Sequence, residues 1–305
     1  MSAPLVAFLM VLVGVQFSAQ APVNGGLGRT VGPLAAAFVS FAVGTVALFA
    51  VCVIGGRIDG LSSLGEAPLW QLAGGLIGAT YVALAAMTIS RIGAGVIAAV
   101  TVTGQLACSV VVDHFGWFGI EVHDVTGARV LGLVLLLAGA LAMLYSREEA
   151  TAGPGGTAGT RERLILCGVI LVASLAVGIQ HPINAELADN VGDFSAGLVN
   201  FTVGTLALAA AVVLLGKSRG LRRVGQARPQ YFLGGLIGMI VVLTSLSAVT
   251  VIGAAGLTSA LVSGQMIGSL LLDRVGAFGL TRIPVDRMRI VAAFALLAGT
   301  FLATG

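Results

Sequence analysis

Two short motifs place carboxamide side chains beside a proline in otherwise apolar segments. The first is Gln20-Ala-Pro-Val-Asn24 and the second is Gln180-His-Pro-Ile-Asn184. Proline removes a backbone donor and frees a carbonyl one turn earlier, and both amides can donate and accept hydrogen bonds. This chemistry suits contact with a polar solute. The alternative is that the motif only ends a helix near the membrane surface, and in both cases we expect the helix to end there.

A second set of polar residues repeats in the middle of two apolar segments. Gln105 and Ser109 lie one helical turn apart, as do Gln265 and Ser269. An unsatisfied amide in hydrocarbon is costly, so each glutamine must face another helix or a water-filled cavity. Hydrogen bonding between packed helices is therefore the alternative to solute binding. The expected substrate-binding residues are Gln20, Asn24, Gln105, Ser109, Gln180, Asn184, Gln265 and Ser269.

Asp113 and Asp273 are the carboxylates that recur at equivalent positions near the ends of apolar segments. Each is followed by a Phe-Gly pair and then by an arginine, Arg129 or Arg289. An aspartate in a site of low dielectric can exchange a proton near neutral pH, which makes both residues candidates for ion coupling. Their place at helix ends equally suits a helix cap or a structural ion pair with the arginine.

The composition excludes several classes of function. Hydrophobic residues make up 57% of the 305 residues and charged residues only 10%, whereas soluble chains carry roughly 25% charged residues. The three histidines and three cysteines lack the spacing of metal ligands, so we expect neither metal nor cofactor. No H-E-x-x-H or G-x-S-x-G motif indicates an enzyme. The arginines lie in short loops, which does not favour a nucleic-acid partner.

The same motifs occur twice, at a constant separation of 160 positions. The separation holds for Gln20 and Gln180, for Gly104-Gln105 and Gly264-Gln265, and for Phe118-Gly119 and Phe278-Gly279. A constant offset through unlike residues indicates a tandem duplication.

Small residues spaced four apart allow helices to approach closely. The glycines expected at helix contacts are Gly44, Gly74, Gly78, Gly204, Gly234 and Gly238.

The elements that must position these residues are membrane-spanning helices, since lipid leaves no other partner for the backbone. Five apolar segments occupy each half, at 4–24, 34–54, 69–90, 93–113 and 126–146, and again 160 positions later. Because five is odd, the second half must start on the opposite side of the membrane. We therefore predict an all-α membrane protein of ten transmembrane helices in two inverted repeats. The predicted boundaries are 1–149, a linker at 150–163, and 164–305.

The basic residues predict the orientation in a bacterial inner membrane. Fourteen of the 16 lysine and arginine residues lie on one set of alternating loops, and only Arg57 and Arg129 lie on the other. Cytoplasmic loops carry the excess of positive charge. Both termini are therefore expected outside the cytoplasm.

Together these motifs resemble the YdcZ-like family of the drug/metabolite transporter superfamily, in its fused two-half form. The resemblance covers essentially the whole chain and implies a central cavity between the repeats and alternating access driven by an ion gradient or by exchange. Small multidrug relatives carry a membrane-embedded glutamate in the first helix, whereas this chain has Gln16, Gln20 and Asn24 there. The difference favours a neutral or zwitterionic solute, uniport, or coupling through the two aspartates.

The expected function is secondary-active transport of a small polar or amphipathic metabolite or drug. A proton or a sodium ion is the candidate coupling ion, the lipid bilayer is the surrounding partner, and the chain is expected to be a monomer or a homodimer. The alternative is a membrane scaffold or lipid-handling protein that uses the same helices for packing alone.

Overall fold

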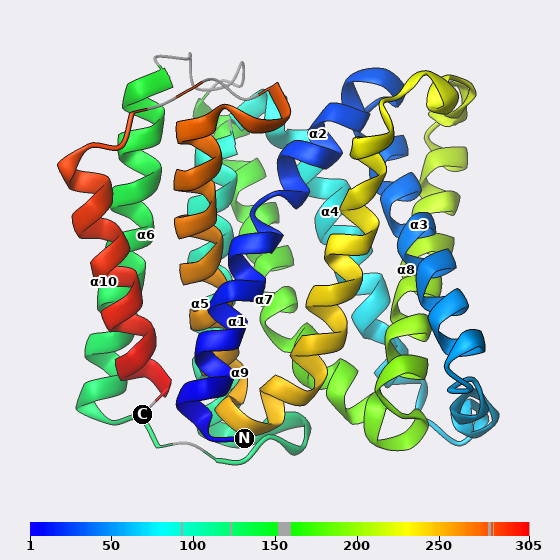
Figure 1. Cartoon of the computed structure of the whole chain (residues 1–305), viewed down its shortest axis with the longest axis horizontal. Helices are drawn as coiled ribbons and strands as arrows, with labels where there is room; N and C mark the ends of the chain where they lie inside the picture. The colour runs from blue at the N-terminus through cyan, green and yellow to red at the C-terminus, as the bar shows by residue number, and fades with distance from the viewer. Residues whose placement is uncertain (93, 123, 152–159, 280–281, 283, 305) are drawn as a thin grey trace. The chain divides into compact units, whose positions relative to one another are not determined.

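The computed structural model describes residues 1–92, 94–122, 124–151, 160–279, 282 and 284–304, and these residues form helices and no strand (Figure 1). Most of the predicted linker, residues 152–159, lies outside the described residues. The α-helices are α1 Ala3–Phe17, α2 Gln20–Val31, α3 Pro33–Ile54, α4 Ala73–Ile92, α5 Ala94–Phe115, α6 Gly127–Thr151, α7 Thr160–Val191, α8 Asp193–Leu214, α9 Leu233–Val275 and α10 Arg287–Thr304. The 3-10 helices are η1 Asp59–Gly65, η2 Leu69–Leu72, η3 Trp117–Gly119, η4 Ser218–Gln226, η5 Pro229–Phe232 and η6 Ala277–Gly279.

Helices cover most of each apolar segment that the sequence predicts to be helical, within the described residues. Six helical stretches in the described part of the chain are long and apolar enough to cross a membrane, which indicates a multi-pass membrane protein. These stretches are Ala3–Val31, Pro33–Ile54, Leu69–Thr88, Arg161–Val191, Asp193–Leu214 and Pro229–Val275. The last contains two of the predicted segments, which meet at Gly253 with φ 70° and ψ 173°. Ten membrane crossings in a five-plus-five arrangement stay a prediction.

The expectation that helices end at the two proline motifs is wrong. The first helix breaks before its motif, at Ser18 and Ala19, and α2 then runs through the motif to Val31. Pro22 is the third residue of α2, where a missing N–H removes no helical bond. In the second half, α7 continues past Pro182 to Val191.

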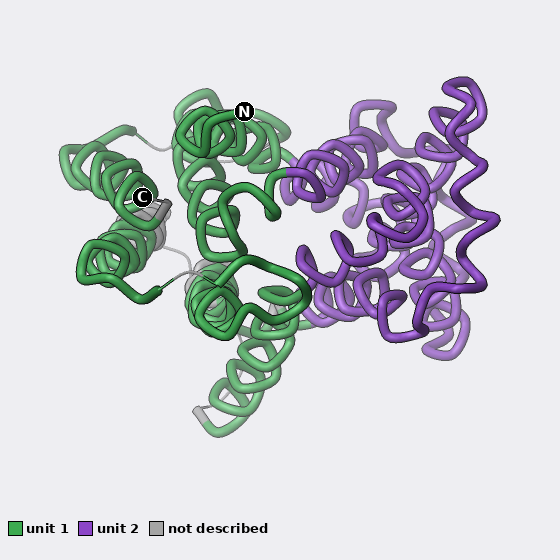
Figure 2. The backbone as a smooth tube through the Cα atoms, turned by 90° about the horizontal axis from the view of Figure 1, so that it is seen from below, with its two compact units in different colours: residues 1–19, 88–179, 248–305 green, residues 20–87, 180–247 purple. Residues whose placement is uncertain are grey.

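The described chain forms two compact units, each built from both halves of the sequence (Figure 2). Unit 1 contains residues 1–19, 88–179 and 248–305, and unit 2 contains residues 20–87 and 180–247. The chain passes between units after residues 19 and 87, and again after residues 179 and 247, which are 160 positions later. The duplication therefore extends from the motifs to the way the chain is divided.

Unit 1 pairs α6 with its own copy, α10, in opposite directions (Figure 1). A Cβ at Gly132 would lie 2.7 Å from the carbonyl oxygen of Gly299, and one at Gly139 would lie 3.0 Å from that of Ala292. Glycine therefore allows the two backbones to touch. Leu136 and Leu296, both fully buried, occupy the core of this contact.

Unit 2 pairs α3 with its copy, α8, also in opposite directions (Figure 1). The Oγ1 atoms of Thr45 and Thr205 lie 2.8 Å apart, and the rings of Phe41 and Phe201 have centroids 5.3 Å apart. Each of these residues contacts the residue 160 positions away. Contact between a residue and its own copy is what a pseudo-twofold axis through the helix pair produces.

Candidate functional site

The candidate site is built from amide side chains that pack on glycines in unit 2. At the start of α4, a Cβ on Gly74 would meet Oδ1 of Asn184 and would lie 3.2 Å from Oδ1 of Asn200. Only glycine leaves room for both amides. Asn184 comes from α7 and Asn200 from α8, so three helices meet at this cluster.

The first half supplies the equivalent cluster. A Cβ on Gly234, near the start of α9, would lie 3.0 Å from Cγ of Asn24 and 3.1 Å from Oγ of Ser40. Asn24 thus packs on a glycine of the second repeat, and Asn184 packs on a glycine of the first. The two clusters are related by the same 160-position offset and interlock the repeats within unit 2.

The two predicted glutamines lie next to these clusters. Gln20 donates from Nε2 to the carbonyl oxygen of Gly234, at 3.1 Å. The Nε2 atom of Gln180 would lie 2.8 Å from a Cβ on Gly78, and that of Gln20 would lie 2.6 Å from a Cβ on Gly238. The structure therefore brings the four predicted amides of the proline motifs into one compact unit.

Three amide oxygens in these clusters are buried without a hydrogen-bond partner among the described residues. They are the Oδ1 atoms of Asn24, Asn184 and Asn200. The side chains of Asn184 and Asn200 are 2% and 3% exposed. A buried polar atom left unsatisfied costs about 1–3 kcal/mol, so these oxygens are acceptors that a ligand's donors could satisfy.

Asn200 is absent from the sequence-based site. The sequence places it four residues before Gly204, and that spacing favoured helix packing, with a sliding surface as the second interpretation. An asparagine in the middle of an apolar segment was the available signal. Its counterpart in the first half is Ser40, so the repeat itself does not single it out.

The other four predicted residues belong to unit 1. Ser109 donates to the carbonyl oxygen of Gln105 and lies 2.8 Å from Oγ1 of Thr258. Ser269 donates to the carbonyl oxygen of Met266, at 2.8 Å. Both serines donate to a carbonyl of their own helix, and Ser109 also bonds to Thr258 of α9, whereas Gln105 and Gln265 are partly exposed.

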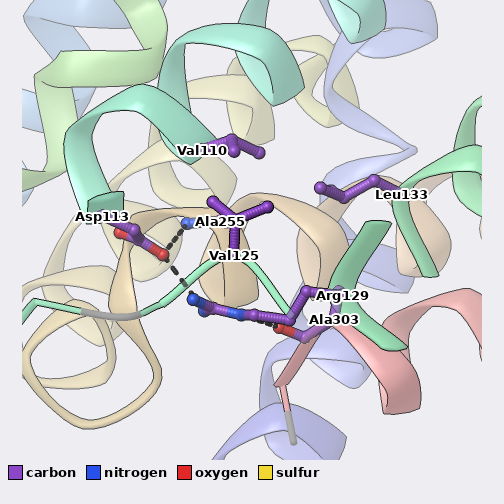
Figure 3. A pocket seen from close by; sticks show the side chains of 7 residues that line it. All are labelled: Val110, Asp113, Val125, Arg129, Leu133, Ala255 and Ala303. Carbon is purple, nitrogen blue, oxygen red and sulfur yellow. Dashed lines mark hydrogen bonds and ion pairs between the residues drawn. The ribbon is translucent and has the colours of Figure 1, made fainter. Parts of the chain in front are cut away.

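Asp113 forms a buried polar cluster in unit 1 (Figure 3). Its carboxylate accepts hydrogen bonds from the backbone N–H groups of Ala254, at 2.6 Å, and Ala255, at 3.0 Å. Arg129 lies 3.3 Å from the same carboxylate and also donates to the carbonyl oxygen of Ala303. Asp113 therefore caps the part of α9 that follows Gly253, and these contacts favour a structural role for it.

The cavity beside this cluster is small. It is lined by Val110, Asp113, Val125, Arg129, Leu133, Ala255 and Ala303, and its volume is about 10 Å³ (Figure 3). Such a volume holds a single water molecule at most. The second half repeats the ion pair, with Arg289 3.4 Å from Asp273 and both side chains buried.

Six long apolar helical stretches and a duplicated chain are typical of membrane transporters of small molecules. The family model described as "Putative inner membrane exporter, YdcZ" matches residues 5–142 and again residues 165–302. The chain therefore belongs to the YdcZ family of the drug/metabolite transporter superfamily, in the fused two-half form that its motifs predicted. It is a transporter of the inner membrane.

The chain was also compared with curated protein sequences and with solved structures. No curated protein matches the chain in sequence. A solved structure described only as the crystal structure of a protein is similar over 98% of this chain and 96% of the other, with a TM-score of 0.70 and 16% identity. At that identity the likeness concerns the fold alone.

Proposed function

We propose that this protein is a secondary-active transporter that moves a small polar or amphipathic solute by alternating access through a cavity between the two repeats. The observation that carries the proposal is the set of buried acceptors on Asn24, Asn184 and Asn200. A solute that presents N–H or O–H donors would satisfy them. The family's description as an exporter favours movement out of the cell.

The antiparallel pairing of two helices with their copies supports the transport mechanism. In unit 1, α6 and α10 run in opposite directions, and in unit 2, α3 and α8 do so. If these helices cross the membrane, the two repeats have opposite orientations. Two inverted repeats can exchange their conformations, which opens a site to one side and then to the other.

Solute binding tests the site directly. We expect that a screen of amino acids, polyols and organic amines finds a solute that raises the Tm of the wild-type protein in detergent. The double variant Asn24→Leu/Asn184→Leu keeps the branch at Cγ, replaces the amide atoms by larger methyl groups and removes two acceptors. We expect it to lose the response to that solute, measured against the variant's own Tm, because the methyl groups pack more tightly on Gly74 and Gly234 and change the Tm by themselves.

The matched control is Thr45→Val/Thr205→Val. It removes both partners of a satisfied hydrogen bond in the same unit, so the solute response should be unchanged. A full response in the asparagine variant would overturn the site, and the efflux of solutes from proteoliposomes then decides whether transport itself stands.

The proposed orientation has both termini outside the cytoplasm. A cysteine at Ser62, in η1, should react with a membrane-impermeant thiol reagent in intact cells. One at Arg222, in η4, should react only after the cells are opened. The reverse pattern of labelling would contradict the orientation.

A further inference from the structure

The 3-10 helices η1 and η4 are equivalent elements with the same packing. Both belong to unit 2, and each lies against the end of a helix from the other repeat. A Cβ on Gly60 would meet the carbonyl oxygen of Val191, and one on Gly220 would meet that of Val31. The apolar residues Leu61 and Leu64 of η1, and Leu221 and Val224 of η4, face the corresponding cores.

The two elements differ in charge at equivalent positions, because η4 has three arginines where η1 has one aspartate and two serines. Asp59, Ser62 and Ser63 of η1 correspond to Arg219, Arg222 and Arg223 of η4. All three arginines are exposed, and none forms a hydrogen bond or ion pair with the part of the chain that the structure describes. Since η1 adopts the same helix without them, the fold does not require these arginines.

The surroundings of η4 place it at the level of lipid headgroups. The large apolar residues Leu214 and Leu215 precede it along the chain and are 83% and 50% exposed, and Leu233 follows it at 45%. Lys217 and Arg228 flank the element on the two sides. Exposed apolar side chains belong in the acyl region, so the basic residues between them lie beside the headgroups.

We propose that the exposed face of η4 binds the headgroups of anionic phospholipids. The chemistry is that of guanidinium and phosphate: a planar guanidinium donates two parallel hydrogen bonds to phosphate oxygens, and four of the five basic residues here are arginines. Electrostatic attraction of juxtamembrane basic clusters to anionic lipid adds to this. The acidic η1 forms no equivalent surface, so the preference belongs to one end of unit 2.

Lipid-dependent stability of the full-length protein tests the proposal. The probes are phosphatidylglycerol and phosphatidylcholine with identical acyl chains, added to the purified protein in a neutral detergent. We expect phosphatidylglycerol to raise the Tm above the value in phosphatidylcholine. The variant Arg222→Ser/Arg223→Ser carries the residues that η1 has at these positions, and it should lose more than half of that difference.

The control variant Arg161→Ser/Arg163→Ser removes the same charge from exposed positions at the start of α7 and should keep the full difference. Inorganic phosphate alone should produce no shift. The proposal is wrong if the η4 variant keeps the whole effect of phosphatidylglycerol, if both variants lose it equally, or if free phosphate reproduces it. If the double variant does not fold, Arg222→Ser alone gives the same comparison with a smaller expected loss.

Discussion

Asn184 and Asn200 have buried amide oxygens in a membrane protein. In hydrocarbon surroundings no water is present to donate a hydrogen bond to an unsatisfied acceptor. The two side chains are 2% and 3% exposed, and neither oxygen has a partner in the described chain. If these positions only packed helices together, an apolar side chain would fill them without leaving an unsatisfied acceptor. The proposed solute site rests on these two oxygens, and the role that the sequence motifs predict for Asn184 stays a prediction.

A substitution at Gly74 tests how tightly Asn184 and Asn200 pack against the start of α4. In Gly74→Ala the new Cβ meets Oδ1 of Asn184, so the amide must shift, and this should reduce the free energy of unfolding by about 1–3 kcal/mol. Gly25→Ala is the control, because nothing lies within 4 Å of its Cβ and alanine is the better helix former. Equal stability of the two variants in thermal unfolding would contradict the cluster.

A substitution at Asp113 distinguishes a structural role of this residue from a role in ion coupling. In Asp113→Asn the loss of charge leaves Arg129 buried beside a neutral amide, and we expect a loss of stability of about 3–5 kcal/mol. The exposed carboxylate of Asp124 supplies the control variant Asp124→Asn, which should unfold like wild type. A stable Asp113→Asn protein that loses only its response to a proton or sodium gradient would assign ion coupling to Asp113.

At the scale of elements, the positions of the helices could be predicted from hydropathy. Each apolar segment of about 20 residues lacks any other way to satisfy its backbone in lipid. The break before Gln20 and the long α9 could not be predicted, because hydropathy contains no backbone angles. Pro22 suggested the end of a helix, but its place in the first turn of α2 leaves that helix intact.

The pairing of α3 with α8 predicts a specific cross-link. In a background without native cysteines, Thr45→Cys/Thr205→Cys should form a disulfide, because the two hydroxyl oxygens are 2.8 Å apart. A protease site in the predicted linker at 150–163 then separates the halves, and they should stay joined on a gel until they are reduced.

Leu206 supplies the matched control for this cross-link. Thr45→Cys/Leu206→Cys moves the second cysteine by one residue, to a side chain that is 65% exposed, and it should not cross-link. If the halves of the Thr45→Cys/Thr205→Cys protein separate under oxidising conditions, the antiparallel pairing of α3 and α8 is wrong.

At the scale of the whole molecule, the duplication and the family could be predicted from the sequence. The same motifs recur 160 positions apart, and these motifs are the ones that resemble the family. The division into two units could not, since it depends on contacts between repeats rather than within them. Gln20 and Asn24 share a unit with Gln180 and Asn184, whereas Gln105 and its copy Gln265 belong to the other unit. The 160-position offset pairs each residue with its copy but does not show which pairs share a unit.

Efflux from proteoliposomes tests the central claim most directly. Vesicles loaded with radiolabelled amino acids, polyols or organic amines are compared with protein-free vesicles, with and without a proton or sodium gradient. We predict that the wild-type protein and Thr45→Val/Thr205→Val release at least one solute faster than empty vesicles, and that Asn24→Leu/Asn184→Leu does not. Full release by the asparagine variant would contradict the amide site, and release by no protein at all would contradict transport of these solute classes.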